Sequence, residues 1–298
     1  MKNGLLFVRD FYDPLFTHVL NKLVRTKDIT GAIVTGNPGI GKSAFGLYAI
    51  WRLLTGSPPR NVVLRSAKLQ RTTVLRTDGT FAQGAIDSIP DEAGDNMAVF
   101  IADGTAPPLL SCFTLVIASP AVAESKPMRN VMIKSHDADF LFFPMFSTTE
   151  MSELRRLAFP NVLQSTMERL MRIWGGSPLL CLRKWRPRSQ AAAVSLMNCI
   201  DEAGVRAALA GTEGSQERFA YDFLLDFVPL GWTANPEAAA LPLSDRRRYE
   251  RGGARLVSCA WREFVANRTR FTRIHHVVPF LAALGNTNLS AAMRGIFH

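Results

Sequence analysis

The stretch GNPGIGKS at residues 36–43 combines the residue types that bind phosphate groups. Glycine lets the backbone approach an anion closely, and successive N–H groups at the start of a helix form an anion-binding nest. The spacing Gly-x-x-x-x-Gly-Lys-Ser matches the Walker A pattern, in which Lys42 reaches the β- and γ-phosphates and the Ser43 hydroxyl ligates Mg²⁺. We therefore expect ATP and magnesium to bind at Gly36, Asn37, Pro38, Gly39, Ile40, Gly41, Lys42, Ser43 and Ala44.

The segments on either side of this stretch have the order that such a site requires. The apolar run GAIVTG (31–36) predicts a strand that leads directly into the glycines, and SAFGLYAIWRLL (43–54) predicts a helix. A plain glycine-rich turn between a strand and a helix is the alternative. The strand before and the helix after favour the phosphate site.

A magnesium ion at such a loop also needs an acidic residue at the end of another strand. Asp103 closes the apolar run MAVFIAD and is the best candidate, although a strand-terminal turn aspartate is the simpler interpretation. Ser119, at the end of FTLVIAS, faces the γ-phosphate if its strand lies between the other two, and a plain strand terminator is the alternative. We thus expect Lys42, Asp103 and Ser119 as catalytic residues, with Ser43 and Asp103 as the metal ligands.

The residue that would activate water is not identified. Gly104 stands beside Asp103, where many ATPases carry an acid, so we expect hydrolysis to be slow or to use another residue or a partner. A scaffold that binds the nucleotide without hydrolysing it is therefore an alternative. The sequence also does not decide whether the nucleotide is ATP or GTP. Four other acids are candidates for activating water, and their spacing does not favour one of them: Asp91, Glu92, Asp95 and Glu124.

Five short apolar runs predict an α/β fold, specifically a P-loop NTPase with a parallel five-stranded sheet flanked by helices. A helical lid and a C-terminal helical region are expected to follow. The segment 72–81 predicts a hairpin with Asp78-Gly79 as its turn. The runs lie at 31–36, 61–66, 97–103, 113–119 and 139–146.

Four segments are expected along the chain: a helical lead-in at 1–27, the NTPase core at 28–150, the lid at 151–182 and a basic helical region at 183–298. The pattern Ser147-Thr-Thr-Glu150 predicts a capping box at the start of the first lid helix. Further helices are expected at 162–174, 191–210, 218–227 and 254–266.

The composition indicates a soluble, basic protein, whose anionic partner would be nucleic acid, an acidic protein or a membrane surface; a basic surface without such a partner is the alternative. The net charge is +10 with a pI near 9.9, and residues 179–298 carry 16 Lys/Arg against 10 Asp/Glu. The four cysteines are far apart, without a CxxC pair, and are expected to be buried thiols. We find no signal peptide, and the apolar runs are shorter than the roughly 20 residues of a membrane span.

Two basic runs make nucleic acid a candidate partner. Arg183, Lys184, Arg186 and Arg188 surround Trp185, and a second cluster lies at 246–248. Guanidinium groups and an aromatic ring suit phosphate contact and base stacking. A solvated basic face is the simpler alternative for both runs, and self-association of the chain is left open.

Other enzyme classes have weaker footholds. Asp103 with Glu124 and Lys126 loosely matches a nuclease D…ExK set, but Asp103 is already assigned to magnesium. The pair His275-His276 has no partners at meaningful spacing. A small-molecule kinase needs an acceptor pocket and an arginine lid, whereas the helical half with its Gly-Ser-Pro element favours a switch-type NTPase.

In order along the chain, the segments FVRDFYDPLF, TGNPGIGKSAFGLYAIWRL, FIADG, TLVIASP, FPMFSTTEMSEL and IWGGSPLLCL resemble the P-loop NTPase region of crinkler effectors. Trypanosome retrotransposon hot-spot proteins share that region. The resemblance covers roughly residues 6–182, and the tail AAMRGIFH is similar to the entry into a C-terminal effector domain. The secretion header of the family is not seen from Met1 onward.

The resemblance implies an ATPase module that powers or gates a separate toxin domain, secreted into a host cell and acting in its nucleus. In related signal-transduction NTPases a Gly-x-Pro element contacts the nucleotide base, which implies that role for Gly176 and Pro178. An arginine ahead of that element faces the nucleotide in such proteins, and Arg169 and Arg172 both have a suitable position.

Overall fold

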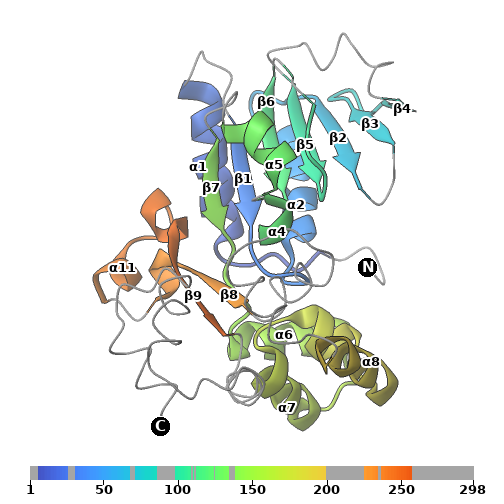
Figure 1. Cartoon of the computed structure of the whole chain (residues 1–298). Coiled ribbons are helices and arrows are strands. Elements are labelled where there is room, and N and C mark those ends of the chain that lie inside the picture. Colours follow the sequence, from blue (N-terminus) through green and yellow to red (C-terminus); the bar gives the residue numbers. More distant parts are fainter. Residues whose placement is uncertain are drawn as a thin grey trace. The chain divides into compact units, whose positions relative to one another are not determined.

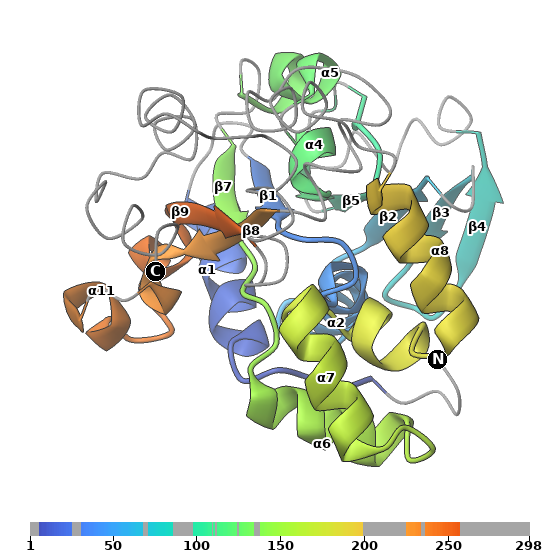
Figure 2. The same ribbon diagram turned by 60° about the horizontal axis from the view of Figure 1, so that its bottom comes forward.

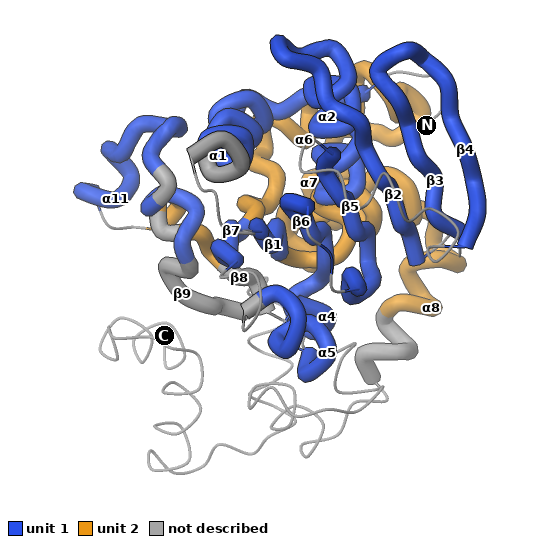
Figure 3. The backbone as a smooth tube through the Cα atoms, turned by 90° about the horizontal axis from the view of Figure 1, so that it is seen from above, with its two compact units in different colours: residues 1–35, 41–142, 235–250 blue, residues 36–40, 143–234, 251–298 orange. Residues whose placement is uncertain are grey.

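The computed structural model describes residues 6–25, 31–67, 71–85, 98–108, 110, 112–123, 125–133, 138–198, 225–233 and 236–256. The chain divides into two compact units (Figure 3). Unit 1 contains residues 1–35, 41–142 and 235–250, and unit 2 contains residues 36–40, 143–234 and 251–298.

A mixed seven-stranded sheet, in the order β4-β3-β2-β5-β6-β1-β7, forms the centre of unit 1 (Figure 1). Strands β2, β5, β6, β1 and β7 run parallel, and β3 and β4 pair antiparallel at one edge. The strands are β1 (Gly31–Thr35), β2 (Val62–Ser66), β3 (Thr72–Leu75), β4 (Phe81–Gly84), β5 (Val99–Asp103), β6 (Phe113–Ile117) and β7 (Asp139–Phe142).

The central strands are apolar along their whole length because helices cover both faces of the sheet. Every residue of β1 and β6 is buried. Helices α1 and α2 lie on one face, and α4 and α5 lie on the other (Figures 1 and 3). The bounds in unit 1 are α1 (Tyr12–Arg25), α2 (Lys42–Thr55), α4 (Pro120–Ala123), α5 (Lys126–Met128), the π-helical turn η2 (Arg129–Ile133), α11 (Pro236–Ala240) and η5 (Arg246–Tyr249).

The sheet is larger than the five parallel strands expected from the sequence. The predicted hairpin forms, with Leu75 opposite Phe81, and its strand β3 also pairs with β2. Its turn follows the expected chemistry: Gly79 has φ +86°, and the backbone N–H of Thr80 donates to Asp78 Oδ1 at 2.8 Å. The hairpin therefore extends the sheet at one edge and makes it mixed.

Unit 2 is mainly helical over residues 143–198. Its first helix begins with the predicted capping box: the Glu150 N–H donates to Ser147 Oγ at 3.2 Å, and the Ser147 N–H donates to Glu150 Oε2 at 2.9 Å. Gly175 follows the second helix with φ 61°. The helices are α6 (Thr148–Ala158), α7 (Gln164–Trp174), the π-helical turn η3 (Leu179–Arg183) and α8 (Pro187–Asn198).

Two of the helices expected further along the chain are wrong where the structure describes them. Residues 225–229 form strand β8 (Leu225–Pro229) and residues 251–256 form strand β9 (Arg251–Leu256), which pair antiparallel. The short helix η4 (Leu230–Trp232) follows β8. Gly252 and Gly253 are weak helix formers, and the ladder to β8 gives this backbone its hydrogen bonds. Most of the segments 191–210, 218–227 and 254–266 lies outside the described residues.

No helix in the described ranges is long and apolar enough to cross a membrane. Cys112 and Cys181 are buried thiols outside any disulfide, as expected, whereas Cys199 and Cys259 lie outside the described residues. Burial raises the pKa of the Cys181 thiol to about 12, so this thiol stays protonated and unreactive at neutral pH.

Candidate phosphate-binding site

The predicted phosphate loop connects the end of β1 to the first turn of α2. Three of its glycines have left-handed backbone angles: φ is 145° at Gly36, 77° at Gly39 and 96° at Gly41. Residues with a Cβ rarely adopt such angles. The glycine spacing of the motif is therefore required by the conformation of the loop itself.

The start of α2 is open to an anion. Its N-cap is Gly41, no side chain caps the helix, and the first turn contains no acidic residue. Because the first amides of a helix lack partners within the helix and carry partial positive charge, they attract a phosphate. Lys42 is buried, with 8% of the residue exposed, and adds a cation at this end.

Ser43 and Asp103, the two expected metal ligands, lie together. The Ser43 hydroxyl donates to Asp103 Oδ1 at 3.0 Å. Sixty residues separate them in sequence, and the parallel order of β5, β6 and β1 brings the carboxyl ends of their strands to one edge of the sheet. A hydroxyl and a carboxylate are oxygen donors that suit Mg²⁺, which takes its remaining ligands from water and phosphate.

Both neighbouring strands hold the backbone around Asp103. The Ala67 N–H donates to the Asp103 carbonyl at 2.9 Å, and the Gly104 N–H donates to the Ile117 carbonyl at 2.7 Å. Gly104 has φ 73°, a conformation that disfavours side chains. The position beside Asp103 is thus adapted to glycine, and it carries no acid.

Strand β6 lies between β1 and β5, which is the condition that the sequence reasoning set for Ser119. The Ala118 N–H donates to the Val34 carbonyl at 3.1 Å, so the chain leaves β6 beside the end of β1. Ser119 is the next residue and is partly exposed. It therefore follows the strand that separates the phosphate loop from Asp103, and its role as a sensor stays a prediction.

An aromatic cluster that sequence reasoning missed supports the start of α2. The Tyr12 hydroxyl donates to the Gly41 carbonyl at 3.1 Å, and the Tyr12 and Phe45 rings pack edge to face with centroids 5.4 Å apart. Tyr48 extends the cluster and donates to Asp13 Oδ1 at 2.8 Å. Burial raises the pKa of Tyr48 above its ordinary value. The aromatic residues of FYDPLF were the available signal, but residue type alone does not reveal which backbone they contact.

Within unit 2, the segment after α7 packs against the first half of the phosphate loop. The Ser177 hydroxyl donates to the Pro38 carbonyl at 3.3 Å. A Cβ added at Gly39 would lie only 2.3 Å from the Leu179 Cβ, so a side chain there would collide. The structure therefore brings the Gly-Ser-Pro element to the loop through Ser177 and Leu179, two residues for which the sequence predicted no role.

The two base-contacting residues of that element have different surroundings. Gly176 is buried against Phe146: its carbonyl accepts from the Phe146 N–H at 3.1 Å, and an added Cβ would lie 2.1 Å from the Phe146 carbonyl oxygen. Pro178 is partly exposed and precedes η3. Gly176 is thus required by the close approach of two backbone segments, and a contact of either residue with a base stays a prediction.

Several other candidate residues are exposed or lie outside the described ranges. Arg169 and Arg172 are both exposed on α7, so their exposure does not decide which of them would face a nucleotide. In the described part of the chain no group of three or more His, Cys, Asp or Glu side chains could hold a metal ion. The candidate residues that lie outside the described ranges are Asp91, Glu92, Asp95, Glu124, His275 and His276.

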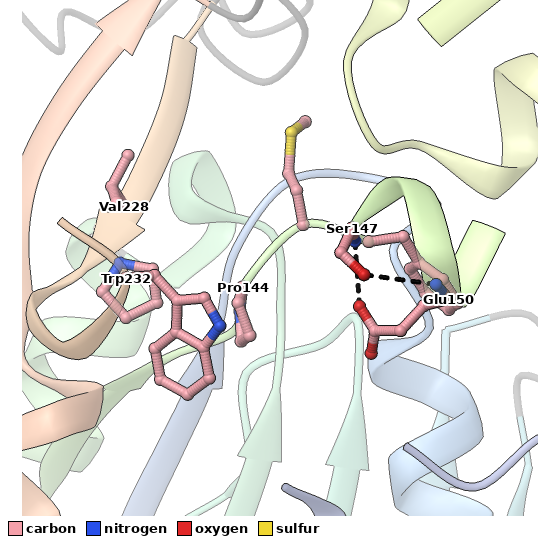
Figure 4. A pocket seen from close by; sticks show the side chains of 8 residues that line it. Pro144, Ser147, Glu150, Val228 and Trp232 are labelled. Atoms are coloured by element: carbon pink, nitrogen blue, oxygen red, sulfur yellow. Dashed lines mark hydrogen bonds between the residues drawn. The ribbon is translucent and has the colours of Figure 1, made fainter. Parts of the chain in front are cut away.

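Unit 2 also has a shallow cavity of about 200 Å³ (Figure 4). Trp232 and Pro144 line one side of it, and the capping box of Ser147 and Glu150 lines the other. The hydrogen bonds of the box, drawn as dashed lines, occupy the polar atoms of this wall. The capping box therefore already uses Ser147 Oγ and Glu150 Oε2 on this wall of the cavity.

No protein-family model matches the chain, and no curated protein matches it in sequence. Among solved structures, the Thermotoga maritima RuvB Holliday junction branch migration motor is similar at 16% identity and a TM-score of 0.38, over 63% of this chain. That match spans 64% of the RuvB chain, less than two thirds of its length.

Two further solved structures are similar at the same level. The ADP form of the Aeropyrum pernix ORC2 protein matches at 14% identity and a TM-score of 0.40, over 74% of this chain and 69% of that one. The S. cerevisiae Hsp104–ADP complex matches at 12% identity and a TM-score of 0.40, over 74% of this chain and 38% of the Hsp104 chain. With TM-scores below 0.5, these likenesses do not decide the function of this chain.

Proposed function

We propose that the chain binds ATP with Mg²⁺ at residues 36–44 and hydrolyses it. The observation that carries this proposal is the hydrogen bond of 3.0 Å between Ser43 and Asp103, beside the uncapped start of α2. A Walker A match by sequence predicts only the loop. The pairing of its serine with an acid at the end of β5 supplies the second half of a magnesium site.

Each residue of the site has one task in this proposal. The amides of the loop and of the first turn of α2 hold the phosphates. Lys42 neutralises charge on the β- and γ-phosphates, and its burial strengthens that interaction because water screens it less. Ser43 and Asp103 hold the metal ion, which offsets the charge that develops on the phosphate oxygens. Ser119 senses the γ-phosphate from the end of β6.

Slow turnover follows from the residue beside Asp103. Gly104 offers no carboxylate to orient water, and its φ of 73° would strain any replacement. Hydrolysis in this proposal therefore relies on a residue elsewhere or on a partner. A scaffold that holds ATP or ADP without turnover is the second candidate, and the same glycine favours it.

The resemblance to crinkler effectors supports a wider role as a switch or motor for an effector activity in a host nucleus. In this role Gly176 and Pro178 would contact the base, and the contacts of Ser177 and Leu179 with residues 38–39 supply a physical link. Occupation of the loop would then alter the packing of η3. The output of such a switch is carried by another domain.

Nucleotide binding by the full chain tests the central proposal. We expect calorimetry with Mg²⁺ and a non-hydrolysable ATP analogue to detect binding, and Lys42→Ala to weaken it about 10- to 100-fold, the range for a lost hydrogen bond to a charged group. Lys126→Ala is the matched control, because Lys126 is exposed at the start of α5. Equal binding by all three proteins would contradict the proposal.

Hydrolysis of ATP then separates the two candidates. Phosphate release that is lost in Lys42→Ala and in Asp103→Asn identifies an ATPase. Tight binding without phosphate release by the unmodified chain identifies the scaffold. We expect Asp103→Asn to remove the dependence of binding on Mg²⁺ while leaving the loop folded, because the amide oxygen can still accept from Ser43.

A further inference from the structure

The two basic clusters that the sequence predicts as nucleic-acid contacts differ in the bonds that their side chains form within the protein. In the cluster at 246–248, Arg247 Nη2 lies 2.7 Å from Asp245 Oδ2. Arg248 Nη1 donates to the carbonyls of Ala239 and Leu241. These two guanidinium groups are used to fold their own segment, so this cluster is a poor candidate for a partner.

The cluster at 183–188 has no such internal use. Arg183, Lys184, Arg186 and Arg188 are all exposed. None of them forms an ion pair or a side-chain hydrogen bond with another described residue. Four like charges within six residues repel one another, and the first turn of α8 has no acid to offset them.

The backbone that carries these cations is held by a hydrogen-bond network centred on the half-buried Gln190. Gln190 Nε2 donates to the Leu180 carbonyl at 2.8 Å and to the Lys184 carbonyl at 2.7 Å. Gln190 Oε1 accepts from Trp174 Nε1 at 2.6 Å, and only 2% of Trp174 is exposed. Figure 2 shows the chain passing from α7 through a short helical turn to α8. The charges are therefore presented by a fixed frame.

The same sign of charge continues over the helices of unit 2. Residues 147–198 contain eight Lys/Arg and three Glu. Arg155 is used internally, because it donates to Gln164 Oε1 at 3.0 Å and to the Val162 carbonyl at 2.9 Å. Arg169 and Arg172, three residues apart on α7, are exposed and lie on one face of that helix.

We propose that η3, the start of α8 and the exposed face of α7 form a surface that binds the phosphate backbone of nucleic acid. Five of the six exposed cations are arginines, and the planar guanidinium matches a phosphate with two hydrogen bonds. The partly exposed ring of Trp185 lies among them and offers a face on which a base can stack.

A lipid surface fits this cluster less well. Binding to a membrane interface normally adds large apolar side chains to the basic ones. The exposed leucines of unit 2, Leu157 and Leu163, lie before α7, and the cations of 183–188 follow its other end. The 11-residue helix α7 places these leucines about 16 Å from the cations of 183–188, and the part of the surface between them carries Arg169 and Arg172 rather than apolar side chains.

Fluorescence anisotropy of labelled DNA with the full chain, without nucleotide, tests this surface over a series of salt concentrations. We expect binding that weakens linearly with the logarithm of salt concentration, and a slope smaller by about 2 for the double variant Arg186→Ala/Arg188→Ala. Duplex and single-stranded DNA are compared, because stacking on Trp185 favours the single strand. Omission of nucleotide keeps this result independent of the ATP site.

The matched control is Arg71→Ala/Arg129→Ala, which removes the same charge from two exposed arginines of unit 1. We expect its salt slope to equal that of the unmodified chain, and circular dichroism to show that both double variants are folded. The proposal is overturned by absence of DNA binding at low salt, or by equal losses in the two variants. It is also overturned if Arg186 and Arg188 are needed for binding to phosphatidylserine vesicles and not to DNA.

Discussion

The two compact units hold their structures by different means. In unit 1 the strands are buried on both faces, and Ile33, Phe100 and Val116 belong to one continuous apolar cluster. In unit 2 the segment after α7 is held by close backbone approaches, such as that of Gly176 to Phe146, and by single side chains such as Gln190. Both units bury apolar side chains, but the segment after α7 in unit 2 depends in addition on a few positions of fixed size.

Loss of volume is expected to have the largest effect, in the sheet. Phe100 in β5 is fully buried, and Phe100→Ala should lower the free energy of unfolding by about 4 kcal/mol because of lost apolar contact and a residual cavity. Urea unfolding followed by tryptophan fluorescence measures this loss. A loss below about 1 kcal/mol would mean that the core repacks readily, which the close packing of protein interiors does not predict.

Addition of volume is expected to be nearly as harmful in unit 2. Gly176→Ala would place a methyl group 2.1 Å from a backbone carbonyl, and the shift needed to relieve it should cost about 3 kcal/mol. Gly79→Ala is the control, because Gly79 has φ 86° but open space around it, so only backbone strain of about 1 kcal/mol is expected. If the two substitutions cost the same, the contrast between the units fails.

Removal of one polar contact in unit 2 should have a smaller effect. Ser147→Ala deletes the acceptor of the Glu150 N–H in the capping box and should cost about 1 kcal/mol. Ser147→Asp keeps an acceptor at the helix start and is expected to restore most of the loss. Unfolding midpoints of the two variants, compared with the unmodified chain, test this order.

A change of pH should have the smallest effect, and only in strong acid. Hydrogen bonds from Arg247 lower the pKa of Asp245 below its ordinary value of 3.8. Because the folded-state pKa is the lower one, the contribution is present above pH 3.8 and is lost as the pH falls through the folded value. We expect the free energy of unfolding of Asp245→Asn to be closer to that of the unmodified chain at pH 2 than at pH 7. Equal differences at the two pH values would count against this assignment.

Local signals in the sequence were sufficient for much of unit 1. The glycines of residues 36–41, the apolar runs and the Asp78-Gly79 turn each act within a few residues, and the observed strands, turn and helix α2 agree with them. The position of Asp103 beside the phosphate loop could also be predicted, because a strand-terminal acid is recognisable and parallel strands end at a common edge, whereas its role as a metal ligand stays a prediction. Its pairing with Ser43 needed only the strand order.

Contacts between distant segments could not be predicted in the same way. Ser177 and Pro38 are 139 residues apart, and neither residue type indicates the other. The pairing of β8 with β9 was missed because the apolar residues of 218–227 and 254–266 have a spacing that also suits a helix. In such segments the partner strand, rather than the local pattern, decides the conformation.

The hydrogen bond between Ser43 and Asp103 also has a consequence for the entropy of metal binding. Closing a loop of 60 residues costs about 4 kcal/mol of chain entropy. Folding of the sheet has already fixed the ends of that loop 3.0 Å apart. A magnesium ion that bound both oxygens, as proposed, would therefore not have to bring these two side chains together.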